Sequence, residues 1–176
     1  YNECISLIIP KEYKFPHQPN LMQRRNVIRL QKQKRIGNFT GMGGGKTLSA
    51  VLSSRIIGSK ITIIFCPNST IDGWRETILE TFPDSDAQEK TWNPQWDYSK
   101  THHYLILNHE MQQQPNSEKK IKLFCKNYIV DFVVIDEVHQ NKQRYAEASL
   151  RRQRLELFIR LCEKKNSDLY LVGQSG

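Results

Sequence analysis

Short runs of β-branched and aliphatic residues alternate along this chain with longer stretches of helical spacing. Turn residues bound the short runs, and nearly every position within a run is apolar. Such runs are typical of parallel strands that are covered by helices on both faces. The alternation therefore predicts an α/β fold built on an open parallel sheet flanked by helices.

The pattern predicts five strands and five helices. The strands are expected at residues 36–40, 61–65, 104–107, 132–135 and 169–172. The helices are expected at residues 21–33, 46–57, 70–81, 118–128 and 144–164, and in the last two apolar residues recur at three- and four-residue spacing. Polar and proline-containing stretches predict surface loops at residues 83–101 and 112–117.

Size and composition narrow the class of protein. The chain has 176 residues, which suits a single domain over residues 1–176. No apolar run approaches the ~18 residues of a membrane span, so we expect no membrane insertion. Twenty-six Lys and Arg against 18 Asp and Glu give a net charge of +8, which permits a polyanionic partner. The four cysteines are far apart and form no C-x-x-C pair, which predicts neither a zinc site nor a disulfide framework and favours an intracellular, reducing location.

A glycine-rich segment, Gly41-Met42-Gly43-Gly44-Gly45-Lys46-Thr47, lies between the first strand and the next helix. Glycines let successive backbone N–H groups turn toward phosphate oxygens, and the helix N-terminus adds partial positive charge. We expect Gly43, Gly44 and Gly45 to cradle phosphates, Lys46 to reach the β- and γ-phosphates, and Thr47 to ligate magnesium. Thr40 stands where the longer form of this motif has its first glycine, and a flexible turn with an incidental lysine is the alternative.

Two carboxylates, Asp136 and Glu137, follow the apolar run 132–135 directly. Ligands of open α/β sheets bind at the carboxyl ends of the strands, so this position favours a site. Asp136 suits a magnesium ligand, and Glu137 suits the group that polarises the water attacking the γ-phosphate. A solvated turn is the alternative for an isolated acidic pair. Together with the glycine-rich segment, the pair predicts a nucleoside triphosphate site with Lys46, Asp136 and Glu137 as catalytic residues.

The order of these motifs resembles the first RecA-like lobe of superfamily 2 helicases and translocases, most closely the Swi/Snf-like branch. Residues 40–47 resemble motif I, and residues 136–139 resemble motif II in its D-E-x-H form. Residues 15–18 resemble the segment whose glutamine reads adenine, which makes Gln18 the adenine candidate, with Phe15 in place of the usual arginine. The resemblance implies a RecA-like lobe that uses ATP and magnesium and is stimulated by nucleic acid, duplex DNA being favoured.

Two further segments resemble the nucleic-acid motifs of that family. Residues 66–76, with Trp74 on the following helix, are similar to motif Ia, and residues 105–110 resemble motif Ib. The resemblance implies that Ser69, Thr70 and Asn108 contact a nucleic-acid backbone. Helix capping by Ser69 or Thr70 and a turn at Asn108 remain alternatives. Trp74 is interpreted as a core anchor rather than a stacking platform.

Residues 171–176 resemble motif III, which couples the ATP state to lobe movement, with Gln174 in place of the usual threonine or serine. His139 and Gln174 are predicted to hydrogen-bond across neighbouring strand ends, with a polar helix start as the alternative for His139. Because the family hydrolyses ATP between two lobes, the resemblance implies a second RecA-like lobe in the same or another chain, and a location in the cytoplasm or nucleus. An RNA helicase, the motor of a restriction or defence complex and a non-hydrolysing scaffold remain alternatives.

Overall fold

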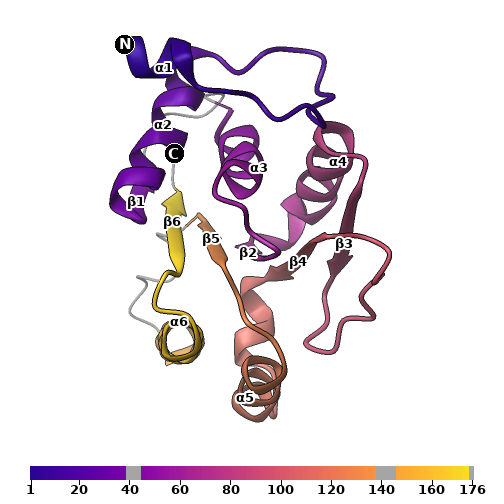
Figure 1. Ribbon diagram of the computed structural model, residues 1–176. Helices are drawn as coiled ribbons and strands as arrows, with labels where there is room; N and C mark the ends of the chain where they lie inside the picture. Colours follow the sequence, from indigo (N-terminus) through magenta and orange to yellow (C-terminus); the bar gives the residue numbers. More distant parts are fainter. Residues whose placement is uncertain (39–44, 138–145, 175–176) are drawn as a thin grey trace.

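The computed structural model describes residues 1–38, 45–137 and 146–174. Within these ranges six strands form one sheet in the order β1-β6-β5-β2-β4-β3, and every neighbouring pair is parallel (Figure 1). The strands are β1 (Arg35–Asn38), β2 (Ile61–Cys66), β3 (Ser85–Glu89), β4 (His102–Asn108), β5 (Phe132–Asp136) and β6 (Tyr170–Gln174). The expected α/β fold with an open parallel sheet is confirmed.

Helices cover both faces of the sheet (Figure 1). One face carries α2 (Leu21–Gln33), α3 (Lys46–Ile56) and α4 (Ile71–Thr81), with the short α1 (Asn2–Ser6) against α2. The other face carries α5 (Ser117–Asn127) and α6 (Ala146–Lys165). Two 3₁₀ turns follow strands directly: η1 (Asn68–Thr70) after β2 and η2 (His109–Gln113) after β4.

The central strands are buried on both sides because their side chains alternate between two hydrophobic clusters. In β2, Ile64 and Cys66 belong to the cluster under α2, α3 and α4, whereas Ile63 and Phe65 belong to the cluster under α5 and α6. Successive strand residues point to opposite faces, so a continuous apolar run fills both clusters. This explains why the strand positions could be predicted from apolar runs.

The predicted helices agree with the structure to within a residue or two at the described ends. The helix α2 has the predicted bounds, and a reciprocal capping box fixes its start: Asn20 Oδ1 accepts from the Gln23 N–H at 2.9 Å, and Gln23 Oε1 accepts from the Asn20 N–H at 2.8 Å. Residues 39–40 of the first predicted strand and 144–145 of the last predicted helix lie outside the described ranges.

The prediction of one loop over residues 83–101 is wrong, because β3 forms the sheet edge within it. The strand sequence Ser-Asp-Ala-Gln-Glu is polar, but the carboxylate of its second residue is satisfied by hydrogen bonds. Asp86 is buried, and it accepts from the Asp97 N–H at 2.8 Å and contacts His103 Nδ1 at 2.8 Å. The second predicted loop, 112–117, is also too long, because η2 includes residues 112 and 113 and α5 begins at residue 117. No helix among the described residues is long and apolar enough to cross a bilayer.

Candidate functional site

The carboxyl ends of β1, β6 and β5 meet at one edge of the sheet, where the phosphate-binding motif and the acidic pair were expected. Gln174 at the end of β6 is in register with Asn38 on one side and Asp136 on the other. The helix α3 begins at the same edge, because the Gln174 Nε2 amide donates to the main-chain carbonyl of Lys46 at 3.1 Å. The fold therefore brings Lys46 and Asp136, which are 90 residues apart in sequence, to one place.

Gly45 precedes α3 in a left-handed conformation, with φ of 68°. A Cβ at this position would lie 2.1 Å from Gln23 Nε2. The Gln23 amide donates to the Gly45 carbonyl at 3.3 Å, and its side chain is buried. The left-handed backbone conformation therefore favours glycine here, and a larger residue would also displace the Gln23 amide.

Lys46 and Thr47 occupy the first turn of α3 and are half-buried. This places a lysine and a hydroxyl at a helix N-terminus, where unpaired N–H groups and the helix dipole favour an anion. Gly43 and Gly44, two of the expected phosphate-binding glycines, lie outside the described residues, as does the coupling candidate His139. Gln174, the other coupling candidate, is buried and contacts Lys46 directly.

Asp136 is the last residue of β5 and is half-buried. Burial raises the pKa of its carboxyl group, and the charge of Glu137 adds to this rise, whereas the Trp74 hydrogen bond and the charge of Lys46 oppose it. The Trp74 indole Nε1 donates to Asp136 Oδ2 at 3.1 Å. Trp74 is 1% exposed, so its interpretation as a core anchor is confirmed, and it also orients the carboxylate.

Glu137 follows Asp136 with φ of 57°, a left-handed backbone conformation that non-glycine residues rarely adopt. Such strain tends to persist at functional sites where surrounding contacts enforce it. The predicted position of the acidic pair at the end of a buried strand agrees with the structure.

The three candidate nucleic-acid residues lie at the carboxyl ends of β2 and β4, beside the acidic pair. Asn108 Nδ2 donates to Asn68 Oδ1 at 3.1 Å, and Asn108 Oδ1 accepts from the Met111 N–H at 3.0 Å. The Thr70 hydroxyl donates to the Pro67 carbonyl at 2.9 Å, and Ser69 is exposed. The turn predicted as the alternative for Asn108 is therefore present, and it leaves Asn108 half-exposed at this edge.

Two residues at this edge were not found by sequence reasoning. Gln23 contacts Gly45, whereas the predicted adenine residue Gln18 is exposed and, among the described residues, makes no side-chain hydrogen bond. The N-x-x-Q spacing of the capping box was a usable signal for Gln23. His109 is fully buried, and its Nε2 lies 2.8 Å from the main-chain oxygen of Asp136. The resemblance of residues 105–110 to motif Ib includes His109 but does not indicate its contact with Asp136, because that contact joins two distant segments.

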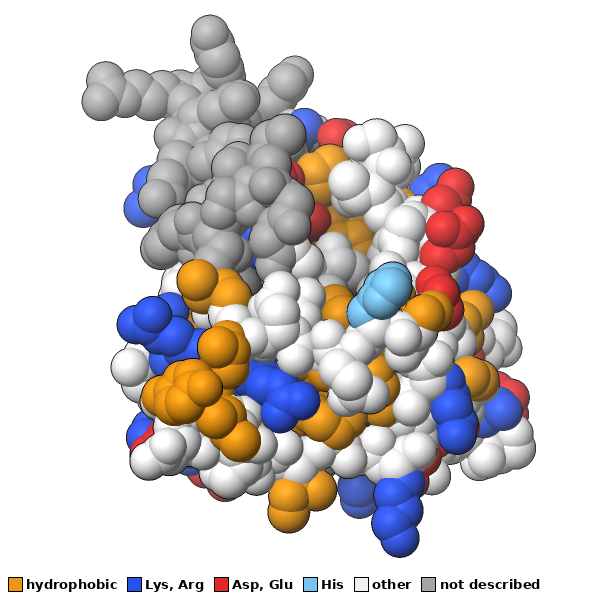
Figure 2. Space-filling model, turned by 90° about the horizontal axis from the view of Figure 1, so that it is seen from above, with side chains coloured by type: hydrophobic (Ala, Val, Ile, Leu, Met, Phe, Trp, Pro, Cys, Tyr) orange, Lys and Arg blue, Asp and Glu red, His pale blue; other side chains and the backbone are white. Residues whose placement is uncertain are grey.

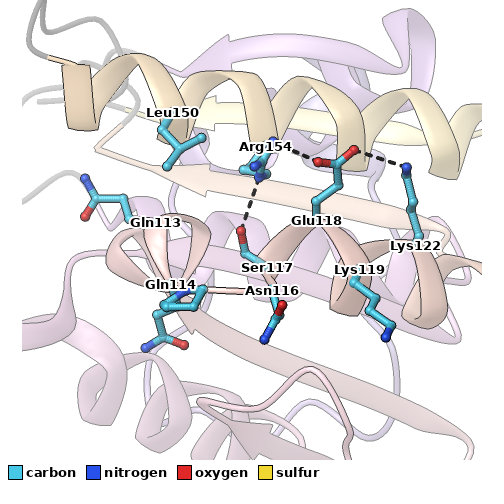
Figure 3. A pocket seen from close by; sticks show the side chains of 10 residues that line it. Gln113, Gln114, Asn116, Ser117, Glu118, Lys119, Lys122, Leu150 and Arg154 are labelled. Carbon is cyan, nitrogen blue, oxygen red and sulfur yellow. Dashed lines mark hydrogen bonds and ion pairs between the residues drawn. The ribbon is translucent and has the colours of Figure 1, made fainter.

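A hollow of about 530 Å³ lies between η2, α5 and α6 (Figure 3). Arg154 points into it and donates to Ser117 Oγ at 3.2 Å, with Glu118 3.5 Å away. The guanidinium of Arg154 thus already has partners within the protein, Ser117 and Glu118. We assign these polar contacts to the packing of α5 against α6.

Comparison with known proteins supports the architecture. No protein-family model matches the sequence, and no curated protein matches it. The Sulfolobus solfataricus SWI2/SNF2 ATPase core in complex with dsDNA matches with a TM-score of 0.62 and 14% identity, over 97% of this chain and 34% of that chain. The UvsW helicase from bacteriophage T4 matches with a TM-score of 0.63 and 16% identity, over 98% of this chain and 57% of that one.

This chain has the fold of a RecA-like helicase lobe. A second structure, the Sulfolobus solfataricus SWI2/SNF2 ATPase core domain, gives the same TM-score, identity and coverage as the complex with dsDNA. The chain spans about a third of the length of the SWI2/SNF2 core and over half of the helicase. At 14–16% identity, these matches show the fold of the chain.

Proposed function

We propose that this chain is the ATP-binding lobe of a nucleic-acid-stimulated ATPase that couples ATP hydrolysis to movement on duplex DNA. The observation that carries the proposal is the meeting of Lys46, at the start of α3, with Asp136 and Glu137 at the end of β5. Gln174 bridges them, through its hydrogen bond to Lys46 and its register with Asp136. A lysine at a helix N-terminus beside a carboxylate pair provides the groups that phosphoryl transfer to water requires.

In this proposal Gly43, Gly44, Gly45 and Lys46 bind the phosphates. Thr47 and Asp136 hold magnesium, which neutralises developing charge on the phosphates when it is bound. Asp136 fits this role because magnesium prefers carboxylate oxygens as ligands, and its half-buried carboxylate lies at the strand end beside the start of α3. Glu137 orients the attacking water and accepts its proton.

In this proposal Gln18 recognises the adenine base of ATP. Gln18 precedes α2, and Gln23 of that helix reaches Gly45. We expect Gln18→Ala to weaken ATP more than GTP in a competition binding assay. Gln23→Ala is the informative companion variant, because it removes the contact with Gly45 and is expected to weaken both nucleotides alike. Equal affinities of Gln18→Ala and the wild type for ATP would remove Gln18 from the site.

The nucleic-acid part of the proposal rests on Ser69, Thr70 and Asn108 at the neighbouring strand ends. Polar side chains and 3₁₀ turns contact phosphates without reading sequence. Positive charge does not gather into one patch on the face that carries α2, α3 and α4, where Lys and Arg side chains are scattered (Figure 2). We therefore place the path of the nucleic acid along the carboxyl ends of the strands. A second RecA-like lobe would lie opposite the ATP site. We expect the protein to act in the cytoplasm or nucleus.

The test is steady-state ATPase activity of the full-length protein, alone and with duplex DNA, single-stranded DNA or RNA. We expect duplex DNA to stimulate turnover most and Lys46→Ala to reduce it at least about 100-fold, because phosphate charge is no longer neutralised. Stimulation by RNA alone would replace the DNA translocase with an RNA helicase. Unchanged turnover in Lys46→Ala would refute the ATPase proposal as a whole.

A further inference from the structure

The buried imidazole of His109 joins the proposed nucleic-acid edge to the proposed catalytic edge. His109 follows Asn108 directly at the start of η2 and has 0% of its surface exposed. Its Nε2 lies 2.8 Å from the main-chain oxygen of Asp136. A carbonyl oxygen only accepts, so Nε2 carries the hydrogen and donates it.

This hydrogen bond spans more than one strand of the sheet. In the strand order, β2 lies between β4, which leads into His109, and β5, which ends at Asp136. The pairing of β5 with β2 ends at Ile135 opposite Phe65, one residue before Asp136. His109 therefore reaches past the end of β2 and holds a peptide group beyond the last paired residue of β5.

The peptide group that His109 holds is the one that joins Asp136 to Glu137. This peptide plane contains the backbone nitrogen of Glu137, so its orientation affects the φ angle of Glu137. That angle is 57°, which is strained for a non-glycine residue. A left-handed conformation is unfavourable for an L-residue, so a contact has to maintain it. The His109 hydrogen bond is placed to do so.

The ring of His109 makes its one side-chain hydrogen bond among the described residues through Nε2. Burial lowers the pKa of its imidazole, and Arg151 adds to this fall, whereas its bond to Asp136 and the charges of Glu110 and Glu137 oppose it. Its Nδ1 is buried and has no hydrogen-bond partner among the described residues. Only the Nε2 side of the ring is used.

We propose that His109 is a positioning residue that fixes the Asp136–Glu137 peptide and transmits nucleic-acid contact at Asn108 to the ATPase centre. This inference rests on the proposed function. Asn108 caps η2 through the Met111 N–H and bonds Asn68, so a phosphate that displaces Asn108 shifts the turn that carries His109. The peptide between the two acidic residues moves with it.

The experiment compares three variants in the full-length protein by kcat, KM for ATP and the ratio of kcat with and without duplex DNA. His109→Leu removes the donor, His109→Gln restores an amide N–H near the position of Nε2, and His109→Asn places its amide near Nδ1 instead. We expect His109→Leu and His109→Asn to lose about tenfold or more in DNA-stimulated kcat with little change in KM, because small misplacement of catalytic groups is costly. His109→Gln should recover most of the stimulation.

Gln112→Leu is the matched control. Gln112 lies in the same turn, is equally buried, and its amide atoms have no partner among the described residues. It should keep the wild-type stimulation ratio. If His109→Leu does not fold, the comparison of His109→Gln with His109→Asn decides the matter.

Equal kcat and stimulation in His109→Asn, His109→Gln and the wild type would overturn the inference, and so would equal loss in all His109 variants. Lys46→Ala separates this failure from failure of the proposed function. If Lys46→Ala abolishes turnover while the His109 variants match the wild type, only the positioning role is wrong. If Lys46→Ala has no effect, the ATPase proposal fails and the role of His109 fails with it.

Discussion

Gly45 is limited both by its backbone conformation and by a neighbouring side chain. Its φ of 68° is left-handed, and a Cβ would lie 2.1 Å from Gln23 Nε2. Gly58 has a similar φ of 75°, but nothing lies within 4 Å of the corresponding Cβ. The two glycines therefore separate the backbone effect from the steric effect.

We predict that Gly58→Ala lowers the free energy of unfolding by about 1 kcal/mol through backbone strain alone. Gly45→Ala should lower it by about 1 kcal/mol more, because Gln23 has to move. Urea unfolding measures both, and a nucleotide-binding titration should show weaker ATP binding only for Gly45→Ala. Equal ATP affinity of the two variants would show that the Gln23 contact does not shape the site.

Trp74 offers a second test at the scale of single residues. Trp74→Phe removes the N–H that Asp136 Oδ2 accepts. Trp92→Phe is the matched control, because Trp92 is also buried and its Nε1 has no partner among the described residues. We expect Trp74→Phe to cost about 1–2 kcal/mol more in unfolding free energy than Trp92→Phe, and to lower kcat. Similar losses in both variants would leave Trp74 with a packing role only.

The sequence predicted those site residues that a local sequence pattern identifies. Lys46 follows a glycine run, and Asp136 follows an apolar run, so the local pattern marks both. Gln23 and His109 depend on contacts with Gly45 and Asp136, 22 and 27 positions away. Only the folded chain brings these partners together, and nothing in the local sequence specifies the pairing.

Among the secondary-structure elements, β3 shows the limit of apolar patterning. The edge strand is polar, so its place in the sheet depends on hydrogen bonds and on neighbouring helices. Arg55 of α3 helps to hold its start, since its Nη1 and Nη2 donate to Asp84 at 3.2 and 2.8 Å. Arg55 Nη2 also donates to Ser85 Oγ at 2.8 Å, and its guanidinium lies 4.3 Å from the centre of the Phe82 ring.

The Arg55 hydrogen bond lowers the pKa of Asp84 below its ordinary value. A lowered pKa stabilises the folded protein above the ordinary pKa of 3.8, and this stability is lost as the pH falls through the lowered pKa. Asp84→Asn should therefore cost about 1 kcal/mol at pH 7, a value reduced because Asp84 is half-exposed. The difference from the wild type should shrink in thermal unfolding as the pH falls below 3.8, and it should disappear once the pH lies below the lowered pKa of Asp84.

Asp168→Asn is the control for this ion pair, because Asp168 and its partner Lys34 are both exposed to solvent. It should change stability less than Asp84→Asn at neutral pH. A loss for Asp84→Asn that persists unchanged at low pH would contradict the role of the Arg55 ion pair at the start of β3.

Across the whole molecule, the strand order explains why the site lies where it does. From β2 the chain moves toward the β3 edge through α4 and then returns to β5 and β6 on the other side of β2. Right-handed crossovers in opposite directions place α4 on one face and α5 and α6 on the other (Figure 1). Ligands bind where the direction of strand order reverses, which is between β2 and β5, so Asp136 at the end of β5 borders this point.

The central claim is that Glu137 activates water for an ATP molecule held by Lys46. The most direct measurement compares ATP binding with ATP hydrolysis in Glu137→Gln of the full-length protein with duplex DNA. The account predicts an ATP dissociation constant close to that of the wild type and a kcat at least about 100-fold lower, because the general base is lost while the phosphate contacts remain. A Glu137→Gln variant that hydrolyses ATP at the wild-type rate would contradict it.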